Sequence, residues 1–241
     1  MKERPIVFSA EMVRAILEGR KTMTRRLVKH PHITNANELD EYFGGGTCED
    51  CDACFYTVPK DSTRICVKCP YGVPGDRLWV KEAWRPKCMN CEDDDVRGGW
   101  YGVMPEYQAD DAQGKWVEVD SAWWEKAYAE GDYGRKWRNS RFMPRWASRI
   151  LLEIVSVRVE RLQEISASDV LREGLEFGPV MEMDPPPYLV AQEIAPHNPG
   201  IHRLFIEPFK ELWDTIHAKK PESQWDANPF CWVIEFKVVT A

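Results

Sequence analysis

The stretch "SAEMVRAILEGRKTMTRRLV", residues 9–28, joins a helix pattern directly to a strand pattern. Ser9 suits a helix N-cap, apolar residues recur at helical spacing as far as Leu17, and Gly19 can end the helix. The "TMTRRLV" that follows, residues 22–28, has strand character. A short amphipathic helix followed at once by a strand is typical of a chain that mixes both elements.

Further segments extend this mixture. In "PGDRLWVKEAW", residues 74–84, Pro74 and Gly75 mark a turn, and alternate positions of the strand predicted at 76–84 share one face. These positions are Leu78, Val80, Glu82 and Trp84. A longer strand is predicted in 140–162, where the apolar alternation changes phase after Ile154 and indicates a bulge. The segment 230–239, "FCWVIEFKVV", alternates clearly and predicts the last strand.

Two more helices are predicted between these strands. "SASDVLREGL", residues 166–175, begins with Ser166 and Asp169 in an acidic capping box and ends at Gly174. "IHRLFIEPFKELWDTI", residues 201–216, is the second. No Gly-rich phosphate turn is present. The element order therefore favours an α+β fold built on a small mixed β-barrel with short flanking helices, rather than a doubly wound sheet.

Composition places the chain among soluble proteins. Hydrophobic residues make up 44% of the 241 residues and charged residues 29%, and no window approaches the roughly 18 apolar residues of a membrane span. The polar N-terminus does not resemble a signal peptide, so we expect a cytoplasmic protein. The net charge of −7 gives no general attraction for nucleic acid, so any such contact has to be local.

The composition and periodicity of the sequence change in three segments. We expect one domain, residues 1–241, carrying insertions at 33–69 (Cys-rich), 86–140 (aromatic and acidic, with a short helix around "SAWWEKAYAEG") and 178–203 (a Pro-rich loop). None of them shows a hydrophobic period, and the chain has no internal repeat.

The cysteines predict a metal site. Seven of the eight lie between positions 48 and 91, and without an export signal they do not form a disulfide framework. Overlapping C-x-x-C pairs predict a structural, tetrahedral zinc site whose four ligands come from a set of five. The set is Cys48, Cys51, Cys54, Cys66 and Cys69. Whether Cys88 and Cys91 hold a second ion with His30 or His32 stays open, and Cys231 fits the core.

The run "GRKTMTRR", residues 19–26, contains side chains that could act as a base and a nucleophile. Lysine can act as a base only when its pKa is lowered by burial or by neighbouring positive charge, and Arg20, Arg25 and Arg26 would supply such charge. Neutral Lys21 would then take the proton of the Thr24 hydroxyl, while the arginines bind an anionic substrate. The alternative is a helix C-terminus decorated with solvated cations, which the helix dipole favours.

Two glutamates are unusual in their positions. Glu173 directly precedes the glycine that stops its helix, at the negative end of the dipole, where a carboxylate is disfavoured unless it has another role. Glu82 lies on an otherwise apolar strand face and is predicted either to contact the edge of a base or to pair internally with an arginine.

Four segments of the sequence resemble those of a known family. "GRKTMTRR", "GDRLWVKEAW", "ERLQEISASDVLREGL" and "WVIEFKVV" are similar to segments of the ASCH domain, a PUA-like β-barrel. Their order also resembles that of small bacterial N4-acetylcytidine amidohydrolases, in which a Lys-x-x-Thr pair and a helix-closing glutamate are catalytic. The resemblance implies the catalytic set Lys21, Thr24 and Glu173, with Arg20, Arg25, Arg26 and Glu82 binding the substrate. It covers about half of the chain and extends to larger ASCH-like phage and prophage proteins.

Three functions follow as expectations. The first is hydrolysis of an N4-acylated or otherwise modified cytosine nucleoside, without a catalytic metal. The second is a non-catalytic module that binds nucleic acid, RNA rather than DNA. The arginines of 20–26, the "RKWRNSR" segment at 135–141 and the Cys-rich zinc insertion would bind phosphate, while tryptophans stack on bases. The third, from the phage relatives alone, is a role in phage morphogenesis or host interaction. The sequence does not decide the oligomeric state.

Overall fold

The structure, a computed structural model, describes residues 1–29, 39–43, 54–59, 65–88, 102–119, 122–123, 125–126, 136–177 and 187–239. The helices in these ranges include none that is both long and apolar enough to cross a lipid bilayer.

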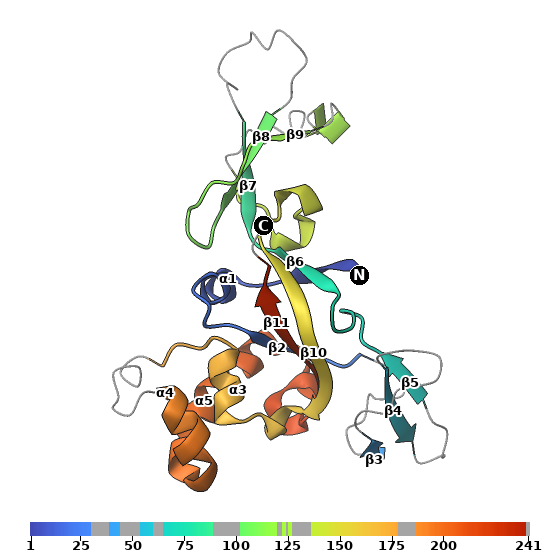
Figure 1. The fold of residues 1–241 in the computed structure, drawn as a ribbon, viewed down its shortest axis with the longest axis vertical. Coiled ribbons are helices and arrows are strands. Elements are labelled where there is room, and N and C mark those ends of the chain that lie inside the picture. Colours follow the sequence, from blue (N-terminus) through green and yellow to red (C-terminus); the bar gives the residue numbers. More distant parts are fainter. Residues whose placement is uncertain are drawn as a thin grey trace. The chain divides into compact units, whose positions relative to one another are not determined.

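Three sheets are formed by the described strands (Figure 1). The five-stranded sheet has the order β1 (Glu3–Val7), β6 (Arg77–Lys81), β10 (Leu151–Arg161), β11 (Phe230–Val238) and β2 (Met23–Leu27). One three-stranded sheet contains β3 (Leu39–Phe43), β4 (Cys54–Pro59) and β5 (Ile65–Lys68), and the other contains β7 (Trp84–Cys88), β8 (Gly102–Tyr107) and β9 (Val117–Glu118). The order of the larger sheet ends at β1 and β2, and these described strands do not close into a barrel.

The helices are few and mostly short. They are α1 (Ala10–Leu17), α3 (Ala167–Arg172), α4 (Pro187–Leu189) and α5 (Pro199–Ile216). Helices beside antiparallel pairing confirm the predicted α+β class. The chain falls into two compact units. One comprises 1–2, 15–77 and 153–237, and the other 3–14, 78–152 and 238–241.

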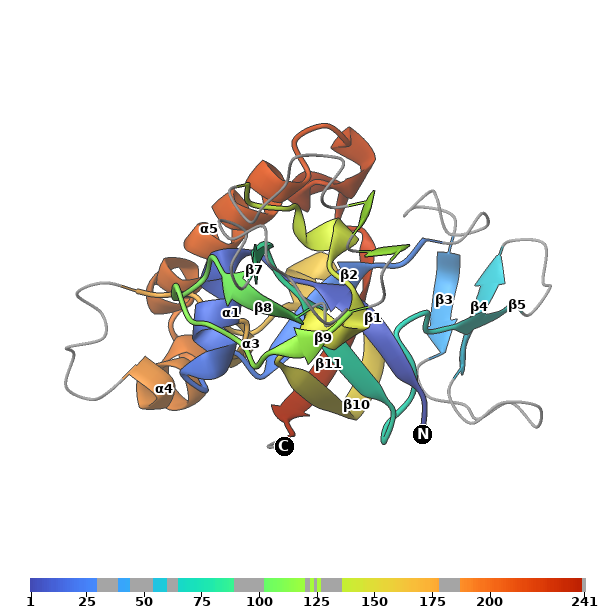
Figure 2. The ribbon, with the colours of Figure 1, turned by 90° about the horizontal axis from the view of Figure 1, so that it is seen from above.

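The first unit has its core under α3 and α5, which lie side by side in both views (Figure 1, Figure 2). α5 begins where the Asn198 side chain accepts hydrogen bonds from two backbone amides and Pro199 occupies the first turn. Its residues Phe205, Phe209 and Trp213 recur every four positions and are buried. The first five residues of β11 are buried as well, so this strand is covered on both faces.

The second unit has a smaller aromatic core. Trp84, Tyr107, Met143 and Ala147 are buried together. The Tyr107 hydroxyl donates a hydrogen bond to the carbonyl of Ala147 at 2.9 Å, which satisfies its polar end inside the core. β7 and β8 pair antiparallel in register from Trp84 opposite Tyr107 to Cys88 opposite Val103.

Several predicted boundaries were wrong. The strand expected over 76–84 is two strands, β6 and β7, and Glu82 lies in the break between them, although its burial continues the alternation of Leu78 and Val80. The Cys-rich insertion, predicted to be a loop, contains β3, β4 and β5, and the insertion at 86–140 contains β8 and β9. Their apolar residues follow no regular period, so the pattern gave no strand signal.

Predictions for the Pro-rich segment and for β10 can also be compared with the structure. In the Pro-rich segment, α4 and a π-helical turn at Val190–Ile194 replace the expected loop. The buried residues Val190 and Ala191 of the π-helical turn, and Ala195 directly after it, belong to the core of the first unit. In β10 the buried positions change from Leu152 and Ile154 to Val159, but Val155 is 51% exposed, so the predicted change of phase holds at Val159 and not directly after Ile154. The helix expected around 121–131 lies largely outside the described residues.

Candidate active site

The end of α3 brings a carboxylate onto the first helix–strand junction. Ser166 caps the helix by accepting a hydrogen bond from the Asp169 amide at 3.1 Å, as predicted. The Asp169 carboxylate, however, binds Arg25 at 2.8 Å instead of completing the capping box. Glu173 is the C-cap, and Gly174 follows with φ +86°, a left-handed conformation that glycine adopts without strain.

Glycine is also required at position 174 because there is no room for a side chain. A Cβ at this position would lie 2.7 Å from the Cβ of Lys21 and 2.9 Å from that of Ala15. Real Cβ atoms do not approach so closely. Glycine therefore lets the end of α3 pack directly against the backbone around Lys21.

Lys21 is fixed between two chain segments. Its amide donates to the carbonyl of Ala15 at 2.9 Å, and the next amide, of Thr22, donates to the carbonyl of Arg172 at 2.9 Å. The Lys21 side chain is fully buried, and its Nζ donates to Glu173 twice: to Oε2 at 2.8 Å and to the backbone carbonyl at 2.7 Å. Residues 152 positions apart thus form one buried pair.

Burial lowers the pKa of Lys21 below its ordinary value, because the charged form loses its hydration. The neighbouring Glu173 opposes this shift, and Arg26 and Arg25 add to it. The direction is the one that a general base requires. The cause ranks differently from the expectation, since burial contributes more than the arginine run.

Thr24 takes a different position from the one expected. It lies in β2 opposite Ile234 and is buried. Side chains alternate along a strand, so Thr24 faces away from Met23 and Arg25, which contact each other. No hydrogen bond joins the Thr24 hydroxyl to Lys21 or Glu173 in the described part of the chain. The structure brings Lys21 and Glu173 together, and Thr24 is not bonded to them.

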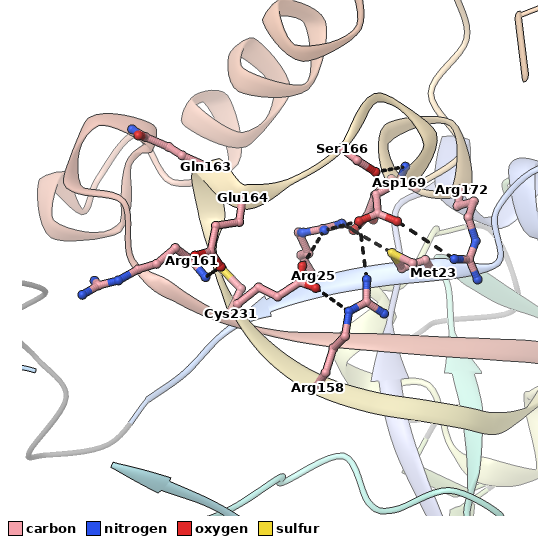
Figure 3. A network of polar contacts seen from close by, with 12 residues as sticks. Met23, Arg25, Arg158, Arg161, Gln163, Glu164, Ser166, Asp169, Arg172 and Cys231 are labelled. Carbon is pink, nitrogen blue, oxygen red and sulfur yellow. Dashed lines mark hydrogen bonds and ion pairs between the residues drawn. The ribbon is translucent and has the colours of Figure 1, made fainter. Parts of the chain in front are cut away.

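Arg25 is the centre of a charge network that sequence reasoning did not find (Figure 3). Its Nη2 donates to Glu160 at 3.0 Å and to Asp169 at 2.8 Å, and its Nη1 lies 3.6 Å from Glu173 Oε1. Arg158 pairs with Glu160, Glu235 and Asp169, and Arg172 with Glu235 and Asp169. The alternation of Arg158 and Glu160 on β10 was the available signal, because strand residues two apart share a face.

The other predicted substrate-binding cations also have protein partners. Arg20 contacts Glu18, Glu176 at 2.8 Å and the carbonyl of Gly174 at 2.8 Å. Burial lowers the pKa of Arg26 from its ordinary value, with Tyr71 and Glu173 opposing the shift.

Glu82 belongs to the second unit. Its two carboxylate oxygens accept hydrogen bonds from Arg149, from Nε and Nη2, each at 3.0 Å. Arg149 also binds Asp110 at 2.8 and 2.9 Å and stacks on Tyr107, 4.0 Å from the ring centre. Burial raises the pKa of Glu82, although its pairing with Arg149 opposes the shift, and burial raises that of Tyr107 to about 12. Glu82 thus has the internal arginine partner that was one of its two predicted roles.

The zinc prediction falls mainly outside the described residues. Cys48 and Cys51 are not described, and for Cys54 and Cys66 only the backbone is, on β4 and β5. Cys69 is buried. Among the described side chains no group of three His, Cys, Asp or Glu residues is arranged to hold a metal ion. His30, His32 and Cys91 also lie outside the described ranges. Cys231 is buried in β11, where burial raises the pKa of its thiol.

No protein-family model, curated protein or solved structure matches the chain. The function has to be inferred from the residues and their geometry.

Proposed function

We propose that the protein hydrolyses the exocyclic amide of an N4-acylated or otherwise modified cytosine nucleoside, with Lys21 as the base and Glu173 as its positioning partner. The observation that carries the proposal is the buried Lys21–Glu173 pair, with Nζ 2.8 Å from Oε2. The resemblance to ASCH-domain amidohydrolases supplies the substrate class, and membership of a PUA-like, ASCH-type fold is part of the proposal.

The hydrogen bonds of Lys21 suit a neutral amine. An uncharged amine has two N–H groups and one lone pair. Glu173 accepts two hydrogen bonds from Nζ, through its backbone carbonyl and through Oε2. A neutral Lys21 would use its two N–H groups for these two hydrogen bonds, and its lone pair would be the group that takes a proton from an attacking hydroxyl.

The reaction needs one nucleophile and one returning proton. Neutral Lys21 takes a proton from the Thr24 hydroxyl or from a water molecule, and the oxygen attacks the acyl carbonyl. The C–N bond then breaks as the Lys21 ammonium returns the proton to the departing amine. With Thr24 as nucleophile, water hydrolyses an acyl-threonine in a second round. With water as nucleophile, acetate leaves directly.

Glu173 can take part through its second oxygen. Oε1 is buried and has no hydrogen-bond partner among the described residues, although Arg25 Nη1 lies 3.6 Å away. A buried acceptor of this kind costs free energy unless it has a use. Accepting a hydrogen bond from the substrate amine or the attacking water gives it one.

The test is deacylation of N4-acetylcytidine, followed by ultraviolet absorbance. We expect turnover in the unmodified protein and a loss of about a hundredfold or more in Lys21→Ala, the typical contribution of a general base. Lys237→Ala is the matched control, because Lys237 also pairs with a glutamate at 2.8 Å but is 62% exposed. No turnover with a panel of acylated cytidines, or full turnover in Lys21→Ala, overturns the proposal.

Thr24 variants separate the two nucleophiles. Thr24→Ser keeps the hydroxyl and Thr24→Val removes it with little change of shape. If Thr24 attacks, only the valine variant loses activity, and an acylated protein accumulates during a rapid burst. If water attacks, both variants turn over and no acyl-enzyme forms.

We also propose a structural zinc ion bound by two C-x-x-C pairs. β4 and β5 are antiparallel with Cys54 opposite Lys68, so Cys54 and Cys69, which directly follows β5, lie at the same end of the hairpin. We expect about one zinc ion per chain by elemental analysis, with four thiolates as ligands. Protein purified without chelator that contains no zinc contradicts this.

Nucleic-acid binding is the second candidate function, favoured by one surface segment of the second unit. Residues 136–145 contain four basic and no acidic side chains. Phe142 is 73% exposed beside the exposed Arg141, and Arg85 stacks on the ring of Trp137 at 4.7 Å. Exposed rings beside cations are typical of surfaces that stack bases and bind phosphate. Arg25, which was expected to bind phosphate, is buried and bound by carboxylates.

Salt-dependent binding of single-stranded RNA tests this second function. Arg141→Ala is expected to reduce the slope of log affinity against log salt by about one, and Phe142→Ala to weaken binding at every salt concentration. Leu204→Ala, another exposed apolar residue, is the control. Affinity that does not change with salt excludes this role.

A further inference from the structure

Arg25 is restrained from one side of its guanidinium. Its Nη2 carries the short contacts, to Glu160 at 3.0 Å and Asp169 at 2.8 Å. Within the described part of the chain, the one hydrogen-bond acceptor of its Nη1 is the Met23 sulfur, at 3.4 Å, a weak acceptor. The side chain is almost completely buried, so water does not share in holding it. The two carboxylates therefore decide where the guanidinium lies (Figure 3).

That position is just short of a bond to Glu173. The distance from Nη1 to Oε1 is 3.6 Å, whereas a charged hydrogen bond of this type measures about 2.7–2.9 Å. A shift of less than about 1 Å would close the gap. Arg25 and Lys21 would then bind the same carboxylate, one at each oxygen. Glu160 and Asp169 pull the guanidinium in the other direction.

We propose that Glu160 and Asp169 are positioning residues for the Lys21–Glu173 pair: by holding Arg25, they keep its guanidinium off Glu173 Oε1 and leave the charge of that carboxylate to Lys21. The charged groups facing Lys21 are Glu173, Arg25 and Arg26, and those facing Arg25 are Glu160, Asp169 and Glu173. The catalytic use of the pair rests on the proposed function. The positioning does not, because the protonation of Lys21 can be followed without any substrate.

Two glutamates of the network make a matched pair. Glu160 and Glu235 are 22% and 20% exposed, and both bind Arg158. Only Glu160 also binds Arg25. Glu160→Gln and Glu235→Gln therefore each remove one negative charge that faces Arg158. Glu235 pairs with Arg172 as its second cation, so only Glu160→Gln weakens the hold on Arg25.

The measurement is a pH titration of lysine side chains labelled with ¹³C at Cε, with the Lys21 signal assigned by its loss in Lys21→Met. We expect Glu160→Gln to lower the Lys21 midpoint by about half a pH unit or more, since Arg25 then shares the Glu173 charge, and Glu235→Gln to move it less than half as far. Asp169→Asn should act like Glu160→Gln and replaces it if that variant does not fold.

A double variant separates positioning from a plain charge effect. In an Arg25→Lys background, whose ammonium is not a planar fork, the Glu160→Gln shift should shrink to the size of the Glu235→Gln shift. Equal shifts in the two single variants, no shift in either, or an undiminished shift in the Arg25→Lys background would overturn the inference. Correct shifts without any turnover refute only the hydrolase, and turnover without these shifts refutes only the positioning.

Discussion

Glu82 and Glu173 are both buried carboxylates bound by a cation, one in each compact unit, but their bonding differs. Both oxygens of Glu82 are bound by Arg149, and the same arginine reaches Asp110. Only one oxygen of Glu173 is hydrogen-bonded within the described residues, by Lys21, and Oε1 has no closer cation there than Arg25 Nη1 at 3.6 Å. The first carboxylate is saturated and the second is not.

The identity of the cation explains what each pair can do. Arginine keeps its proton at every pH that a protein survives, so the Glu82–Arg149 pair can only remain an ion pair. Burial favours the neutral form of a lysine, and it lowers the pKa of Lys21, although Glu173 opposes the shift. Whether a pair can only stabilise the fold or can also transfer a proton is therefore decided by the cation, arginine or lysine, and not by the glutamate.

The largest loss of stability is expected when the Glu82–Arg149 pair is broken. Arg149→Met leaves Glu82 buried without its cation, and we expect the free energy of unfolding to fall by about 3–5 kcal/mol. Urea unfolding followed by tryptophan fluorescence measures it. Arg145→Met is the control from the same segment, because its pair with Glu3 is exposed and should contribute less than about 1 kcal/mol. Equal losses would mean that Glu82 and Arg149 are not a buried pair.

The next effect tests the close packing at Lys21. Gly174→Ala introduces a Cβ 2.7 Å from that of Lys21 at a left-handed position, and should cost about 2–4 kcal/mol. Gly19→Ala is matched, since its φ is +76° and no atom lies within 4 Å of the new Cβ, so only about 1 kcal/mol of strain is expected. If both variants lose the same stability, the end of α3 does not press on Lys21.

Lys21→Met should cost less than Arg149→Met, about 1–3 kcal/mol at pH 7, also by urea unfolding. Glu173 then keeps a second cation, because Arg25 Nη1 is only 3.6 Å away and can move onto it. A loss larger than that of Arg149→Met would reverse the comparison and make the lysine pair the structural one.

The smallest effect is a pH dependence. The folded pKa of Lys21 lies below the 10.5 of a free lysine, so between these two values the unfolded chain binds a proton that the folded chain lacks. Stability from this group therefore rises with pH across that window, by at most about 1.4 kcal/mol per pH unit, and is constant below it. The difference between the unmodified protein and Lys21→Met, followed from pH 7 to 10, should show this rise. A difference that falls with pH contradicts a lowered pKa.

The local part of the site was predictable from sequence. Ser166 as a cap, Gly174 as a stop and Glu173 between them follow from helix-end chemistry, which acts over a few residues. Lys21 follows the first helix for the same reason. The resemblance to ASCH domains then paired Lys21 with Glu173, and the structure places them in contact.

The long-range part was not predictable. Which carboxylates surround Arg25 depends on how α3 lies over β2 and β10, and no local pattern encodes that arrangement. Thr24 shows the same limit, because a shift of one residue along a strand moves a side chain to the other face. In the Cys-rich insertion the strands β3, β4 and β5 have no apolar alternation, so periodicity had nothing to detect.

α3 has only six residues, too few to be stable as an isolated helix. Its last turn is held by what it touches: Arg25 through Asp169, and Lys21 through Glu173 and Gly174. The short segments 21–25 and 169–174 therefore depend on each other structurally, although 143 residues separate them in the sequence. A graft of the Lys21–Glu173 pair into another scaffold therefore has to carry both segments or neither.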